Sequence, residues 1–128
     1  MNTHILIAER DPVLRNTYER YLTSHGCRVA TVSNGLDCLK FFRHFLPEVI
    51  VLEWEMPWGG GDGVLALIRE EFPLLTVKVV VVTDDATAVH PPKSASIPVV
   101  ACLEKPFRMS ELLRVIRTFE TNHCAEMI

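Results

Sequence analysis

The fold class of this chain is decided by the stretch Glu48-Val49-Ile50-Val51-Leu52-Glu53-Trp54-Glu55-Met56-Pro57. Residues 49–52 are apolar at every position rather than at alternate positions, which is typical of a strand buried on both faces. A carboxylate, Glu53, ends the apolar run. The stretch therefore predicts a central strand of a parallel sheet, with acidic side chains where the strand ends.

Strand-length apolar runs and helix-period segments alternate on both sides of this stretch. The other expected strands cover residues 5–8, 28–32, 77–82 and 99–103. Expected helices run from Asp11-Pro12 to Gly26, from Ser33 or Asn34 to Pro47, from Asp62 to Pro73, and over residues 111–122. The second helix should turn Leu36, Leu39, Phe42 and Phe45 inward.

The segment between the fourth and fifth strands breaks the alternation. Residues 86–89 could begin a helix, but Pro91, Pro92 and Pro98 exclude a long one. We expect a short helix or turn here, followed by an irregular loop.

This order of elements predicts an α/β fold with a doubly wound, five-stranded parallel sheet and helices on both faces. In such sheets, ligands and chemistry collect at the carboxyl ends of the strands. The residues to examine for function are therefore Glu9, Arg10, Glu53, Thr83 and Lys105, each of which follows or ends an expected strand.

Composition limits the kind of protein this chain can be. Its 128 residues predict one domain, over 1–124 with a tail over 125–128, and the 48% hydrophobic content is sufficient for a core. A net charge of −3, without basic clusters, does not favour nucleic acid or membrane surfaces. Four scattered cysteines without zinc-site spacing, and the absence of a signal peptide or spanning segment, predict a cytoplasmic protein with reduced thiols.

Four features in order along the chain resemble those of the receiver domain of two-component response regulators. They are the Glu9 that ends the first strand, Glu53 with the Met-Pro and Asp-Gly that follow it, Thr83 at the end of the fourth strand, and Lys105-Pro106-Phe107. The resemblance covers essentially the whole chain. It implies a flavodoxin-like sheet with strand order 2-1-3-4-5.

The resemblance also implies roles for these positions. In that family two acids after the first strand and an Asp ending the third hold Mg²⁺, and this Asp accepts a phosphoryl group from a histidine kinase. A Thr and a Lys bind the phosphoryl oxygens, and the Lys precedes a cis peptide to Pro. Carried over, Glu53 is equivalent to the phosphoacceptor, Glu9 to the first acid, Thr83 to the switch hydroxyl, and Lys105-Pro106 to the lysine and its proline.

The chain departs from the family pattern at several of these positions. Arg10 stands in place of the second metal-binding acid, Glu53 in place of the phosphoacceptor Asp, and Cys102 in place of the switch aromatic. Asp84 stands where a small residue normally leaves room for the phosphoryl group. Glu53 is one methylene longer than Asp, and about 1 Å of misplacement can cost a factor of about a hundred in such chemistry.

Charge at the expected site also differs from that of the family. Glu9, Arg10, Glu53 and Lys105 sum to zero without a metal ion. Divalent cations such as Mg²⁺ require oxygen ligands, and Arg10 supplies a guanidinium instead. We expect no metal site, or one formed by Glu9, Glu53 and Glu55 if any. Instead, we expect Lys105 to form a salt bridge with Glu53, and Arg10 to form a two-oxygen fork with Glu53 or Glu9.

The leading interpretation is a degenerate receiver, without enzymatic activity or cofactor, that binds a protein partner such as a kinase or output protein independently of phosphorylation. We expect a monomer or weak dimer. One alternative is an authentic Mg²⁺-dependent receiver that accepts phosphate at Glu53, and a related one is a permanently activated form in which Glu53 imitates the phosphorylated state. Another is a small-molecule or cofactor binder on the same fold. Trp58 could anchor an interface or shield the site.

Overall fold

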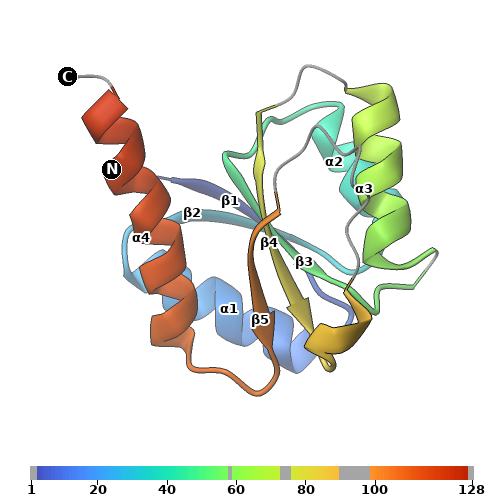
Figure 1. Ribbon diagram of the computed structural model, residues 1–128, viewed down its shortest axis with the longest axis horizontal. Helices are drawn as coiled ribbons and strands as arrows, with labels where there is room; N and C mark the ends of the chain where they lie inside the picture. The colour runs from blue at the N-terminus through green and yellow to red at the C-terminus, as the bar shows by residue number, and fades with distance from the viewer. Residues whose placement is uncertain (1–2, 58, 73–75, 90–98, 127–128) are drawn as a thin grey trace.

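The computed structural model describes residues 3–57, 59–72, 76–89 and 99–126, which form a central sheet between two layers of helices (Figure 1). The strands are β1 (His4–Ala8), β2 (Arg28–Val32), β3 (Val49–Glu53), β4 (Lys78–Thr83) and β5 (Val99–Glu104). All are parallel, in the order β2-β1-β3-β4-β5. The predicted fold class and strand order are confirmed.

The helices are α1 (Pro12–Ser24), α2 (Gly35–Phe42), α3 (Gly60–Glu71) and α4 (Met109–Glu126), with a single 3₁₀ turn, η1 (Ala86–Ala88). Asp11 caps α1 by accepting from the Val13 amide, with Pro12 at the first helical position, and Asn34 caps α2. Helix α4 is longer than expected and includes residues 125 and 126. None of the helices in the described part is long and apolar enough to cross a membrane.

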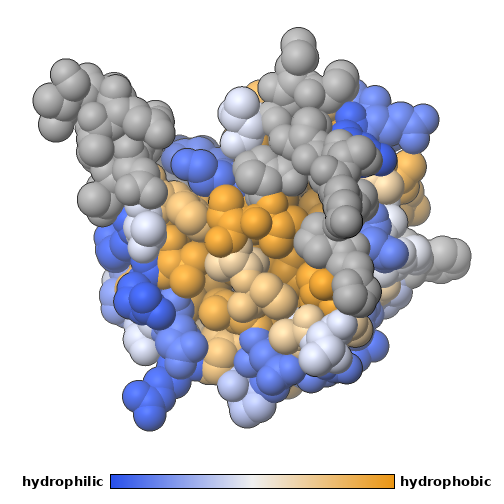
Figure 2. Space-filling view, in the orientation of Figure 1, coloured by the Kyte–Doolittle hydropathy of each residue, from blue (hydrophilic) through white to orange (hydrophobic). Residues whose placement is uncertain are grey.

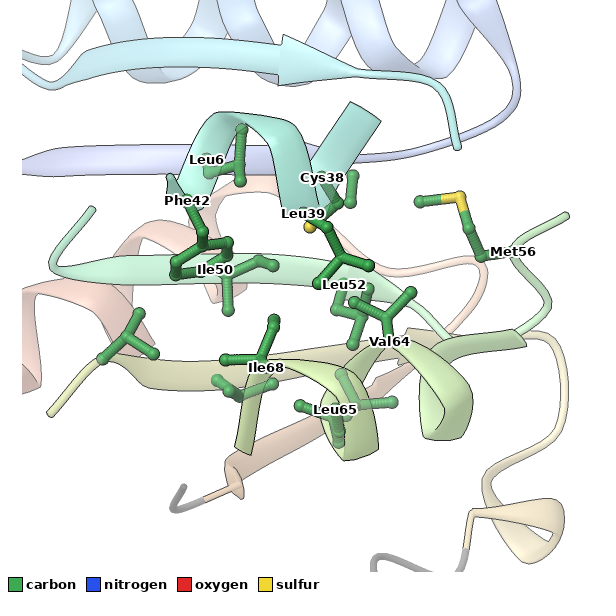
Figure 3. Close-up of a cluster of buried hydrophobic side chains, with 14 residues drawn as sticks. Leu6, Cys38, Leu39, Phe42, Ile50, Leu52, Met56, Val64, Leu65 and Ile68 are labelled. Carbon is green, nitrogen blue, oxygen red and sulfur yellow. The ribbon is translucent and has the colours of Figure 1, made fainter. Parts of the chain in front are cut away.

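The core is divided by the sheet into two layers. Leu6, Ile50 and Leu52 of the sheet point toward α2 and α3, as Figure 3 shows. There they pack against residues of those two helices: Cys38, Leu39, Phe42, Val64, Leu65 and Ile68. The alternate residues Ile5, Ile7, Val49 and Val51 point toward α1 and α4, where they meet Tyr18, Leu22, Leu112 and Ile116. Every residue of β3 is buried, so the continuous apolar run indeed marks the central strand.

Strand β5 lies at one edge of the sheet and is less covered. Its residues alternate between half-buried and exposed, and Val100 is 38% exposed. Figure 2 shows apolar side chains gathered on the face where β5 lies. The segment expected to be irregular begins with η1, whereas residues 90–98 and Trp58 lie outside the described part.

Besides those of α4, two expected helix boundaries were wrong. Helix α2 ends at Phe42 rather than near Pro47, and beyond it the amides of His44 and Phe45 share the Phe41 carbonyl as acceptor, as is common at helix ends. Phe45 therefore lies outside the helix and is 62% exposed, and Leu36 is also exposed. Helix α3 begins at Gly60 rather than after Asp62, with Gly59 at the cap in a left-handed conformation (φ 92°).

Gly61, in the first turn of α3, lies against the backbone that leads out of β3. A Cβ there would lie 2.7 Å from Trp54 Cε3, 3.0 Å from Trp54 Cα and 3.1 Å from the Glu53 carbonyl oxygen. We expect Gly61→Ala to lower the free energy of unfolding by roughly 2 kcal/mol, because this backbone cannot move aside without disturbing Glu53.

Chemical denaturation of both glycine variants measures this effect. Gly63→Ala is the matched control, since a Cβ at Gly63 meets nothing within 4 Å and Ala favours the helix. Equal stability of the two variants would contradict the packing argument.

Candidate functional site

Four side chains predicted from sequence come together at the carboxyl ends of β1, β3, β4 and β5. Glu9, Glu53 and Thr83 are almost completely buried, with 1%, 1% and 0% exposure, and Lys105 is 17% exposed. Parallel strands bring their ends to one edge, which explains this convergence. Two buried carboxylates so close to one another require compensating positive charge.

Glu53 receives most of that compensation. Lys105 Nζ lies 2.6 Å from Glu53 Oε2, so the expected ion pair is present. The backbone N–H of Arg10 donates to Glu53 Oε1 at 3.2 Å, and Arg10 Nε lies 3.5 Å from the same oxygen. Arg10 thus contacts Glu53 through one oxygen and does not form a two-oxygen fork.

Glu9 shares the same ammonium group. Lys105 Nζ lies 3.1 Å from Glu9 Oε1, and the Asp11 amide donates to Glu9 Oε2 at 3.0 Å. The guanidinium of Arg15 donates to the Glu9 carbonyl at 2.9 Å and fixes the backbone at this strand end. Lys105 therefore bridges two buried carboxylates.

The two carboxyl groups differ in protonation. Burial and a hydrogen bond with Glu53 raise the pKa of Glu9 to about 7. Burial also acts to raise the pKa of Glu53, but hydrogen bonds from Glu9, Lys105 and the Arg10 backbone outweigh it and lower this pKa. The pKa of Lys105 is raised, because its contacts with Glu53 and Glu9 outweigh burial.

The Thr83 hydroxyl forms a hydrogen bond with Glu55, which was considered from sequence as a possible metal ligand. The hydroxyl donates to Glu55 Oε2 at 2.6 Å, and the Asp84 amide donates to Glu55 Oε1 at 2.9 Å. In the alternative of a permanently activated form, Glu53 was the carboxylate that would imitate phosphorylation; in the structure Glu55, not Glu53, contacts the Thr83 hydroxyl. Glu55 is half-buried and joins the loop after β3 to the turn after β4.

The three acids considered for a metal are therefore not gathered around one point. Glu9 and Glu53 face Lys105, whereas the Glu55 carboxylate is held by Thr83 and Asp84. Within the described residues, no group of three or more His, Cys, Asp or Glu side chains is placed to hold a metal ion.

The outer rim of the site carries more exposed groups. The Arg10 side chain is 51% exposed, and its Nη2 lies 3.9 Å from Asp84 Oδ2. Cys102 is exposed on β5, and partial burial followed by the charges of Glu104 and Glu55 raises its thiol pKa, which disfavours a reactive thiolate. The peptide between Lys105 and Pro106 is cis.

Sequence reasoning missed three contacts at this site. The bond from Thr83 to Glu55 depends on the course of a loop, and the Lys105 contact with Glu9 depends on the side chain lying between two strands. The Arg15 contact had a weak sequence signal, because Arg15 lies one helical turn after Asp11 and so faces back toward the end of β1.

Comparison with known proteins identifies the family of this chain. The family model described as response regulator receiver domain matches residues 5–117. The probable transcriptional regulator ycf29 of Pyropia yezoensis is 27% identical over 116 residues, which are 91% of this chain and 52% of that protein. The chain thus spans about half of the length of this curated relative.

Solved structures resemble the chain at the level of the fold. A Francisella response regulator receiver domain has a TM-score of 0.79 at 23% identity, covering 94% of this chain and 99% of that one. The receiver domain of a sensor histidine kinase from Pseudomonas aeruginosa, solved with a magnesium ion coordinated in its active-site cleft, also has a TM-score of 0.79, at 24% identity with 92% and 97% coverage.

Proposed function

Because this chain belongs to the response regulator receiver domain family, we propose that it is a two-component signalling module that binds a protein partner without being phosphorylated. One observation carries the proposal. The cationic and hydroxyl groups equivalent to the family's phosphoryl ligands, Lys105 and Thr83, already contact carboxylates of the chain itself.

The electrostatics of the site support this proposal. Glu53 has a cation on each oxygen, with Lys105 at 2.6 Å and the Arg10 Nε at 3.5 Å. A divalent cation would have to displace both groups from Glu53 and would meet the guanidinium of Arg10 where a hard cation requires oxygen. The donor set therefore does not fit Mg²⁺, and no step of the proposed function passes through a metal ion.

The position of Thr83 supports the proposal in a second way. In family members, as the resemblance implies, this hydroxyl binds the phosphoryl group after transfer. Here Glu55 accepts from both the Thr83 hydroxyl and the Asp84 amide and ties the turn after β4 to the loop after β3. The turn is then held in one arrangement, which suits a constant binding surface.

The same contact favours a second candidate, a permanently activated receiver. A carboxylate on the switch hydroxyl imitates one feature of a phosphorylated site, and Glu55 supplies it rather than Glu53. Glu55→Gln separates the two candidates. Loss of binding to a protein partner in this variant would favour the activated form, whereas unchanged binding would favour the static module.

The proposal predicts that the native protein does not respond to Mg²⁺. Tryptophan fluorescence should stay unchanged as Mg²⁺ is raised to about 10 mM, because the carboxylates are already neutralised. An Arg10→Asp/Glu53→Asp double variant should respond in the millimolar range, since it presents three carboxylates to the cation. Trp54 follows Glu53 directly and is the reporter.

Phosphate incorporation is measured on the same two proteins with acetyl phosphate as donor. Mg²⁺-dependent incorporation into the native protein would refute the proposal in favour of an authentic receiver. Arg20→Asp/Glu19→Asp on the exposed face of α1 is the matched control for charge change away from the site.

A further inference from the structure

We call the site formed by Glu9, Glu53, Thr83 and Lys105 the carboxylate site. A hollow lies at the opposite end of the sheet from it. It has a volume of about 270 Å³ and is lined by the beginnings of β1 and β2, by Phe41 of α2 and by residues 45–47. The carboxylate site lies at the carboxyl ends of β1, β3, β4 and β5, so the two sites share only β1 and lie at its opposite ends. We call this hollow the lower pocket.

The walls of the lower pocket are apolar and partly aromatic. The rings of Phe41 and Phe45 stack with centroids 4.9 Å apart, and Ile5 and Val29 contribute aliphatic surface. Phe45 and Leu46 are 62% and 65% exposed, although burial would remove their apolar surface from water. A cavity of about 150 Å³ lined by apolar side chains holds a benzene ring, so the lower pocket has room for one ring and a short substituent.

Two nitrogen-bearing side chains, Arg28 and His4, also line the pocket. Arg28 is exposed, and within the described residues no carboxylate forms an ion pair with it. The neighbouring carboxylate of Glu48 accepts from the His4 backbone amide at 3.3 Å and does not line the pocket. A guanidinium beside an apolar wall matches a planar carboxylate attached to an apolar body.

We propose that the lower pocket binds small carboxylic acids that carry a single aromatic ring, with the ring packed against the stacked Phe41–Phe45 pair and Val29 and the carboxylate on Arg28. A few convergent polar groups on a largely apolar hollow are the usual composition of small-molecule sites. The proposal does not depend on the proposed function, because none of its residues belongs to the carboxylate site.

Binding is tested with 3-phenylpropionate, followed through the backbone amide signals of the ¹⁵N-labelled protein by NMR. We expect saturable shifts confined to the starts of β1 and β2 and to residues 41–46. The neutral isostere 3-phenylpropanol should bind at least about tenfold more weakly, because it cannot form the charge-assisted contact with Arg28.

Two variants locate the site. Arg28→Gln should weaken 3-phenylpropionate binding about tenfold and leave the alcohol unaffected, and Phe45→Ala should weaken both ligands. Both side chains are exposed, so the variants should fold. Arg20→Gln, an exposed arginine on α1, is the matched control and should change nothing.

Several results would overturn the proposal. The proposal fails if the amide signals do not shift with up to about 10 mM 3-phenylpropionate, or if they shift elsewhere on the protein. Equal affinity for 3-phenylpropionate and 3-phenylpropanol, or unchanged 3-phenylpropionate affinity in Arg28→Gln, would also contradict it. Sedimentation velocity tests the other candidate occupant of the pocket, a second copy of the chain. Self-association that Phe45→Ala abolishes would assign the pocket to a second copy of the chain instead.

Discussion

Replacing Lys105 with Met should lower the free energy of unfolding by about 3–5 kcal/mol near neutral pH. The ammonium group lies 2.6 Å from Glu53 and 3.1 Å from Glu9, and both carboxylates are 1% exposed. Without it, two buried acids remain close together with only the more distant guanidinium of Arg10 as a cation. Chemical denaturation of the purified variant measures the loss.

Two further proteins make this result interpretable. Lys40→Met removes an exposed lysine on α2 and should have almost no effect. Glu53→Gln combined with Lys105→Met should recover part of the lost stability, because Glu53, the carboxylate that stays ionised, is removed together with its partner. A Lys105→Met protein as stable as Lys40→Met would show that the bridge contributes nothing.

Glu9→Gln should stabilise the protein at alkaline pH and leave it unchanged in mild acid. The pKa of Glu9 is about 7 in the folded protein against an ordinary value of 4.5. Between these values the folded state holds a proton that the unfolded state releases, so the native protein loses stability as the pH rises from about 4.5 to about 7, and little more above that. The loss approaches about 3 kcal/mol by about pH 8.

Gln is neutral at every pH and can keep a hydrogen bond with Glu53, so the variant lacks this loss. Unfolding free energies near pH 4, below both pKa values, should therefore agree between the two proteins, and near pH 8 the variant should be more stable. Glu53 has a lowered pKa, so its contribution declines only as pH falls below its ordinary 4.5. Parallel pH profiles for native protein and variant would mean that Glu9 titrates normally.

The sheet could be predicted from sequence because its strands carry an unambiguous signal. The apolar run of β3 and the similar run of β4 are explained only by burial on both faces. Helix boundaries were harder to predict from the sequence. The short α2 ends in backbone hydrogen bonds that share the Phe41 carbonyl, and the early start of α3 depends on two glycines that adopt positive φ.

The site was predictable where its residues end strands, since topology alone brings Glu9, Glu53, Thr83 and Lys105 to one edge. The pairing of side chains was only partly predictable. Opposite charge was sufficient to anticipate the contact between Lys105 and Glu53. Whether Glu53 or Glu55 meets Thr83 depends on the course of one loop, which sequence patterns do not determine.

The shielding of the Lys105 bridge has a consequence for the environment in which the domain operates. Dissolved ions screen charges that face water far more than charges buried within a fold. With Lys105 only 17% exposed and both carboxylates at 1%, the bridge is largely withdrawn from the ionic atmosphere. The conformation around the site should therefore change little with ionic strength.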